Sequence, residues 1–235
     1  MPAGTLFAST GNDSTVRLWD TENAQLLRTL RGPTGIVSAV AWSPQATSLA
    51  SGGHDGVVRI WDVATGKLRR TLGQRGKIVR GLAWSPDCTR IVSGEDSVVC
   101  VWNVESGELF DQLNSHTKEV YGVTWSPDGK RFASASGDST VRVWDAVTRD
   151  SLVTLETQDV QKDWPLWSIA WSPDKPMVSW ACGQPLQVPA SGSPNRSSST
   201  NTQVGRRSPD KSQLQVRTAT PIPNSVFRRI KPRGE

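Results

Sequence analysis

The chain has 235 residues, 36% of them hydrophobic, which allows one substantial domain with a buried core. Its net charge of +5 is uneven, because residues 186–235 hold nine Lys/Arg and two Asp/Glu whereas residues 1–185 carry a net charge of −2. The basic character therefore belongs to a C-terminal tail and does not indicate a folded nucleic-acid-binding domain. The three cysteines, Cys88, Cys100 and Cys182, lack paired spacing and exclude a disulfide framework and a zinc site.

Neither a secretory signal nor a membrane-spanning segment is visible in the sequence. The N-terminus lacks the basic region and apolar run of a secretory signal. No apolar stretch approaches the roughly 18 residues that a membrane helix needs. Together with the unpaired cysteines, these features predict an intracellular protein, with the cytoplasm as the first location and the nucleus as the alternative.

The first predicted strands cover residues 5–10, 15–19 and 25–30. They correspond to the second, third and fourth strands of a unit that is complete further along the chain, so the first unit lacks its opening strand. The second unit has predicted strands at 36–42, 48–52, 57–61 and 67–72, and the third unit occupies residues 78–113.

The fourth unit, residues 119–155, shows the pattern most clearly. Residues 120–125 alternate with a period of two, which indicates a strand. Ser126-Pro127-Asp128-Gly129 is a turn sequence, and strands at 131–136, 140–144 and 151–155 follow it. The fifth unit has strands at 166–171 and 176–181 and then stops, so it is a stump.

Two tryptophan motifs recur through these units. A Trp-Ser-Pro sequence ends the first strand of four units, at Trp42, Trp84, Trp125 and Trp171. An aspartate lies six residues before the tryptophan that ends the third strand, in the pairs Asp13 and Trp19, Asp55 and Trp61, Asp96 and Trp102, and Asp138 and Trp144. A period of about 42 residues predicts a repeat protein whose four-stranded sheets stack face to face.

These motifs resemble WD40 repeats, the blades of a β-propeller. The resemblance rests on Trp-Asp at 19–20, 61–62 and 144–145, on Trp-Asn at 102–103 and on the Trp-Ser-Pro turns. The sequence of the Trp-Ser-Pro segments is similar to the regular repeats of fungal and bacterial WD40 proteins. The resemblance implies an all-β repeat region over 4–182, with blades at about 4–31 (partial), 32–74, 75–114, 115–157 and 158–182 (partial). Residues 183–235 are predicted to be a disordered, basic, Ser/Pro-rich tail.

The number of blades leaves two arrangements open. The strand at 166–171 completes the first blade in one of them, which gives a closed ring of four blades. The blades form an open arc in the other. Four blades need about 90° each whereas seven-bladed repeats turn about 51°, which favours an open or incomplete propeller. A further chain or self-association would complete it.

The family often joins a His, a Ser or Thr, an Asp and a Trp within one blade. Only the fourth unit supplies the whole set, with His116, Ser134 or Ser136, Asp138 and Trp144, because the His position holds Pro33, Arg75 and Lys162 in units two, three and five. The resemblance implies structural roles for these residues and for the equivalent pairs Asp13 and Trp19, Asp55 and Trp61, and Asp96 and Trp102. His116 and Asp138 are not interpreted as a catalytic pair, because no nucleophile motif accompanies them.

Propellers of this family bind partners on the face that carries the turn aspartates. The residues that precede those aspartates are Asn12, His54, Glu95 and Gly137, and the positions four residues before each Trp-Ser-Pro tryptophan hold Ser38, Arg80, Tyr121 and Trp167. Arg80, Tyr121 and Trp167 are expected to form one patch of residue types that dominate interfaces. The alternative is that Tyr121 and Trp167 only fill space near the axis.

The sequence holds no phosphate-binding loop, dinucleotide fingerprint, nucleophile elbow or cluster of metal ligands. We therefore expect no catalytic residues, no cofactor and no metal. The predicted function is a non-catalytic scaffold that assembles other proteins, without contact to a membrane. The alternative is a nucleic-acid-associated protein that uses the basic tail.

Overall fold

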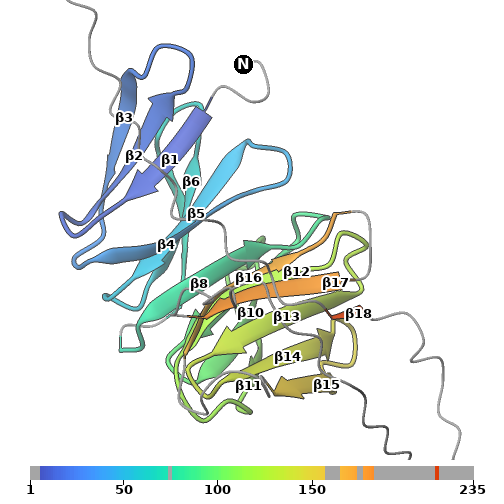
Figure 1. Ribbon diagram of the computed structural model, residues 1–235. Helices are drawn as coiled ribbons and strands as arrows, with labels where there is room; N and C mark the ends of the chain where they lie inside the picture. Colours follow the sequence, from blue (N-terminus) through green and yellow to red (C-terminus); the bar gives the residue numbers. More distant parts are fainter. Residues whose placement is uncertain (1–5, 74–75, 157–164, 174–176, 183–214, 217–235) are drawn as a thin grey trace, which may run out of the picture.

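The computed structural model describes residues 6–73, 76–156, 165–173, 177–182 and 215–216. Within these residues all regular secondary structure is β-strand, arranged in five separate sheets (Figure 1). The all-β fold expected from the sequence is therefore confirmed, and the predicted strands agree with the observed ones to within about one residue at each end.

The sheets follow one another along the chain. The first sheet contains β1 (Leu6–Thr10), β2 (Thr15–Asp20) and β3 (Leu26–Arg31). The second contains β4 (Val37–Trp42), β5 (Ser48–Gly53), β6 (Val58–Asp62) and β7 (Leu68–Leu72). The third contains β8 (Val79–Trp84), β9 (Arg90–Glu95), β10 (Val98–Asn103) and β11 (Leu109–Leu113).

The fourth sheet contains β12 (Val120–Trp125), β13 (Arg131–Ser136), β14 (Thr140–Asp145) and β15 (Ser151–Glu156). The fifth contains β16 (Leu166–Trp171), β17 (Met177–Cys182) and β18 (Gln215–Val216). Neighbouring strands are antiparallel in every sheet, except that β18 runs parallel to β17. Gln215 and Val216 thus form a strand inside the tail that was predicted to be disordered, and the rest of the tail, including 183–214 and 217–235, lies outside the described residues.

The Trp-Ser-Pro turns fix the hairpin between the first and second strands of a sheet. In the fourth sheet Ser126 Oγ donates to Asp128 Oδ1 at 2.6 Å and accepts from the backbone N–H of Arg131 at 3.0 Å. Gly129 follows with a φ of 68°, a conformation that glycine adopts without strain. Side chain and backbone therefore specify the same tight turn.

The core lies between the sheets and not inside any one of them. Four apolar clusters are each built from two neighbouring sheets, and one of them contains Val92 and Val99 of the third sheet together with Phe132 and Trp144 of the fourth. Burial of one such side chain stabilises the fold by about 1.5–3 kcal/mol. The first strands β4, β8, β12 and β16 consequently lie next to one another in chain order (Figure 1).

The stack of sheets is open. Strand β16 pairs with β17 in its own sheet, so it does not supply the missing strand of the first sheet, and β1 has no partner on its free edge among the described residues. Of the two arrangements, the open or incomplete propeller is the one observed. The first and fifth sheets form its two ends.

Candidate interaction surface

Three side chains from the third, fourth and fifth sheets form a stack, named the ring stack below, on the face of the propeller where the first strands begin. Arg80, Tyr121 and Trp167 are the second residues of β8, β12 and β16, and each follows a buried aliphatic residue. Because side chains alternate along a strand, burial of that preceding residue turns these three away from the core. The rings of Tyr121 and Trp167 have centroids 4.3 Å apart, and Arg80 Cζ lies 5.7 Å from the centroid of Tyr121.

The stack is partly supported from below and partly exposed. Trp167 is 51% exposed, whereas Tyr121 is half-buried over Gly137, where a Cβ added to the glycine would lie 3.2 Å from Tyr121 Cε2. Arg80 Nη1 lies 3.2 Å from Asp96 Oδ1, and this ion pair holds the guanidinium beside the Tyr121 ring. An exposed indole next to a fixed cation offers a partner both apolar area and hydrogen-bond donors.

The other expected interaction residues lie in different surroundings. Ser38 is exposed, and its Oγ donates to the carbonyl oxygen of Val79 at 2.6 Å, which places it beside Arg80 in the row of first strands. Asn12 and His54 are exposed in turns of the first and second sheets. Both precede turn aspartates, as the expected partner-binding face requires, but they lie in turns and are not part of the ring stack.

Glu95 is not a surface residue and is removed from the expected interaction residues. Its side chain is buried in the third sheet, where Ser93 Oγ donates to Glu95 Oε1 at 2.6 Å. Burial raises the pKa of this carboxyl, against the opposing effect of the hydrogen bond from Ser93. The expectation that Glu95 lies on the partner-binding face is corrected, because the hairpin after it is so tight that Glu95 pairs directly with Val98.

The fourth sheet contains a complete hydrogen-bonded chain of four side chains. Asp138 Oδ2 lies 2.9 Å from His116 Nδ1, His116 Nε2 lies 2.8 Å from Ser134 Oγ, and Trp144 Nε1 donates to Ser134 Oγ at 3.0 Å. Burial alone would raise the pKa of Asp138, but hydrogen bonds from His116, Thr140 and the backbone N–H of Thr117 outweigh it and hold that pKa far below its usual range. This hydrogen-bonded network joins strands of one sheet, and its side chains are buried, as expected of a structural network.

A part of this network recurs in each of the first three sheets, and the sequence interpretation missed it. The indole N–H of each tryptophan donates to a serine of the neighbouring strand at 2.8 Å, in the pairs Trp19 and Ser9, Trp61 and Ser51, and Trp102 and Ser93. The signal that could have revealed these pairs is a serine nine or ten residues before each tryptophan. The Trp–Ser pair is thus present in three sheets in which no histidine takes part.

The turn aspartates of the other sheets have different partners. Asp55 forms a buried ion pair with Arg59 at 2.8 Å and accepts from the backbone N–H of Thr34 at 2.9 Å. Asp13 accepts from Thr15 Oγ1 at 2.8 Å and pairs with Arg17 on the surface. An arginine therefore pairs with the turn aspartate in the first two sheets, where the fourth sheet has His116, while Asp96 faces Arg80 at the stack.

Among the described residues, no group of three or more His, Cys, Asp and Glu side chains is placed to hold a metal ion. The part of the chain that the structure describes also contains no helix long and apolar enough to cross a membrane.

Comparison with known proteins agrees with the sheet pattern. The family model described as WD domain, G-beta repeat matches residues 1–20, 24–62, 66–103 and 107–145, which is more than half of the chain. Each of the last three matches begins with the outer strand of one sheet and continues through the first three strands of the next. No curated protein matches the chain.

Proposed function

Because the chain belongs to the WD40-repeat family, we propose that it acts as a non-catalytic scaffold that assembles other proteins through the stack of Arg80, Tyr121 and Trp167. WD40 repeats generally mediate protein–protein interaction and complex assembly. The observation that carries the choice of surface is the exposed indole of Trp167 against Tyr121, beside a guanidinium that an ion pair already orients.

The chemistry of the stack supports a protein partner. Trp, Tyr and Arg dominate the binding energy of protein interfaces, because each combines a large contact area with directed donors. The three residues stand on strands and not on loops, so little conformational entropy is lost when a partner binds them. Asp96 and Ser38 border the stack and add polar groups at its rim.

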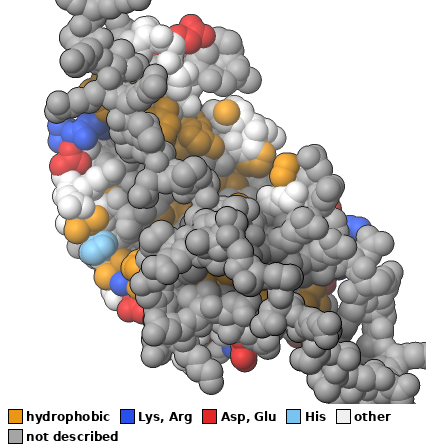
Figure 2. All heavy atoms as spheres, viewed as in Figure 1, with side chains coloured by type: hydrophobic (Ala, Val, Ile, Leu, Met, Phe, Trp, Pro, Cys, Tyr) orange, Lys and Arg blue, Asp and Glu red, His pale blue; other side chains and the backbone are white. Residues whose placement is uncertain are grey.

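Nucleic-acid binding is the second candidate function, and the positive charge of residues 186–235 favours it. All of that charge lies outside the described residues. On the face shown in Figure 2, the coloured Lys/Arg and Asp/Glu side chains are scattered and do not gather in one basic patch. Deletion of residues 186–235 distinguishes the two functions, because it removes the nucleic-acid contacts of the tail, together with β18, and leaves all three residues of the ring stack in the chain.

The open ends of the propeller give a second reason to expect partner chains. Phe7 is 57% exposed on the first sheet, and the free edge of β1 has unpaired backbone groups among the described residues. We propose that a further chain or a second copy covers this end. Light scattering across a range of protein concentrations tests self-association, and a single mass at all concentrations excludes a second copy.

The experiment that tests the scaffold proposal compares partner capture by the wild-type chain with capture by Trp167→Ser. We expect specific partners to be lost or reduced at least about fivefold by this change. Leu152→Ser is the matched control, because Leu152 is an exposed apolar residue on the outer strand β15, away from the stack. Equal capture by wild type and Trp167→Ser, with both proteins folded, rejects the stack as the binding surface.

A further inference from the structure

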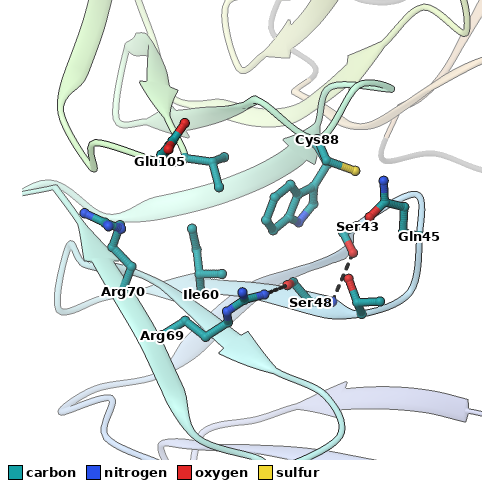
Figure 3. A pocket seen from close by; sticks show the side chains of 11 residues that line it. Ser43, Gln45, Ser48, Ile60, Arg69, Arg70, Cys88 and Glu105 are labelled. Carbon is teal, nitrogen blue, oxygen red and sulfur yellow. Dashed lines mark hydrogen bonds between the residues drawn. The ribbon is translucent and has the colours of Figure 1, made fainter.

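A hollow of about 320 Å³ lies between the second and third sheets, at the ends of the strands opposite to the ring stack (Figure 3). Arg80 stands at the beginning of β8, whereas Trp84 at its end lines the hollow. Apolar side chains of Ile60, Trp84 and Val104 line it together with the charged side chains of Arg69, Arg70 and Glu105. Its volume is in the range of sites that bind small ligands or single large side chains.

Two side chains leave the hollow open. One is shorter than its equivalent between the third and fourth sheets, and the other points in a different direction from its equivalent there. Arg90 of the third sheet crosses to the fourth, where its Nη1 donates to the carbonyl oxygen of Ala146 at 2.9 Å. Ser48 holds the equivalent position in the second sheet, since it pairs with Asp62 as Arg90 pairs with Asn103. A serine cannot span the gap, so the space between Ser48 and Val104 stays open.

The second difference is at the position after the first residue of the outer strand. Phe110 in β11 corresponds to Arg69 in β7, because the preceding residues, Leu109 and Leu68, pair with Trp102 and Trp61. The ring of Phe110 covers the gap between the third and fourth sheets and has two guanidinium carbons within 5 Å of its centroid. The Arg69 side chain instead turns to Ser48 Oγ, which accepts from its Nη1 at 3.0 Å (Figure 3).

The charges around the hollow favour an anionic ligand. Arg70 Nη1 donates to the carbonyl oxygen of Ser106 at 2.8 Å, and Arg69 makes the bond to Ser48. A guanidinium carries five N–H donors, so one such bond leaves its fork able to hold a carboxylate. Glu105 is the acid on the rim. The charge of Arg69 also acts on Asp62. Hydrogen bonds from Thr65 lower the pKa of the Asp62 carboxyl most, and the Arg69 cation lowers it further.

The contact between the third and fourth sheets shows which side chains bind arginines at the equivalent place. There Phe110 supplies a ring to two arginines, and Asp111 Oδ2 lies 2.6 Å from Arg149 Nε. We propose that the hollow binds an acidic peptide segment of a partner protein, with an aromatic or large apolar side chain over Ile60 and Trp84 and an adjacent carboxylate on Arg69. The apolar lining favours a peptide over inorganic phosphate, which has no group to cover it.

This site extends the proposed scaffold function to a second surface, and its test does not depend on the ring stack. The probe is the acetylated, amidated hexapeptide Glu-Leu-Phe-Asp-Gln-Leu, which has the sequence of residues 108–113. Its matched control is Gln-Leu-Phe-Asn-Gln-Leu. Titration calorimetry with the full chain is expected to show saturable binding of the acidic peptide and at least about tenfold weaker binding of the neutral one.

Four variants locate the binding. Arg69→Leu, which introduces the residue found at the equivalent positions 27 and 152, and Ser48→Arg, which fills the hollow as Arg90 does next door, are each expected to weaken binding at least about tenfold. Arg31→Leu on the outer strand of the first sheet and Trp167→Ser at the ring stack are expected to leave it unchanged. Circular dichroism melts confirm that each variant is folded.

Four results overturn the proposal. The first is the absence of saturable heat for the acidic peptide up to about 1 mM. The second is equal affinity for the acidic and neutral peptides, and the third is binding that a folded Arg69→Leu variant retains in full. The fourth is Arg69-dependent binding of inorganic phosphate or of a ten-residue thymidine oligonucleotide that is tighter than binding of the peptide, which assigns the hollow to phosphate groups. Failure here leaves the Trp167 result, and so the scaffold proposal, unaffected.

Discussion

Arg149 Nε lies 2.6 Å from Asp111 Oδ2, and this ion pair joins the turn of the fourth sheet to the outer strand of the third. The two earlier joins use an arginine in the opposite direction, because Arg28 donates to the carbonyl oxygen of Ala64 and Arg70 to that of Ser106. Each join between the first four sheets therefore has a guanidinium contact between an outer strand and a turn of the neighbouring sheet, and Arg90 adds a second contact between the third and fourth sheets. In the first two joins the arginine is on the outer strand and binds a backbone carbonyl, whereas in the third it is in the turn and binds a carboxylate.

Arg149 is in a left-handed conformation, and this gives the first prediction. Its φ is 65°, and the equivalent turn positions hold Gly66 and Gly107 with φ of 72° and 80°. Arg149→Ala loses the ion pair and keeps the strain, so we expect a loss of about 1 kcal/mol in the free energy of unfolding. Arg149→Gly loses the same pair but relieves about 1 kcal/mol of strain, so its stability should be close to wild type. Urea unfolding measures both, and equal destabilisation by Ala and Gly would contradict the assignment of strain.

The second prediction concerns the serine shared by two donors in the fourth sheet. Ser134→Ala removes the acceptor of the buried Trp144 N–H and the partner of His116 Nε2. Leaving such groups unpaired costs about 1–3 kcal/mol, so we expect a loss near the upper end of that range. Ser9→Ala is the matched variant, since Ser9 accepts only from Trp19 in a half-buried place and should cost about 1 kcal/mol or less. Similar losses for the two variants in urea unfolding would argue against a role for the full chain of four residues.

Acid should weaken the same network, and the sign follows from Asp138. Hydrogen bonds from His116 and Thr140 outweigh burial and lower its pKa in the folded chain below the unfolded value near 3.8. Its contribution to stability is therefore fully present above about pH 5 and is lost as the pH falls below the unfolded pKa. Asp138→Asn is expected to cost about 2 kcal/mol at pH 7 and clearly less at about pH 3. Urea midpoints of both proteins at the two pH values provide the measurement, and a constant difference between them would rule out this source of the pH dependence.

The fold could be predicted because the local signals and the packing agree. Turn sequences such as Ser126-Pro127-Asp128-Gly129, the period-two strands and the tryptophans at a spacing of about 42 all specify the same hairpins, and the structure confirms them. The spacing gave a wrong prediction for Glu95, because the third sheet is one residue shorter at this hairpin. Ser93 lies three residues before Asp96, whereas Ser134 lies four residues before Asp138. As a result the Glu95 side chain is buried, and Asp96 is the exposed partner of Arg80.

The surface was only partly accessible to sequence reasoning. The stack of Arg80, Tyr121 and Trp167 could be expected, because equivalent positions on neighbouring first strands must lie side by side. The hollow near Arg69 could not, because it depends on the side chain of Arg69 turning to Ser48 while Phe110 covers the next gap. Rotamer choices of this kind depend on neighbours in space, and no periodicity in the sequence reports them.

The open end of the propeller gives the last prediction, from two phenylalanines at equivalent positions. Phe7 pairs with Trp19 as Phe132 pairs with Trp144, yet Phe7 is 57% exposed and Phe132 is 0% exposed. Phe132→Ala should cost about 3–5 kcal/mol, because it leaves a cavity between two sheets. Phe7→Ala should cost less than about 1 kcal/mol in a single chain, because no neighbouring sheet among the described residues covers it. Urea unfolding at protein concentrations where light scattering shows one chain measures both. A cost for Phe7→Ala that grows with concentration would show that a second copy covers the first sheet, whereas a large cost in the single chain would contradict the open end itself.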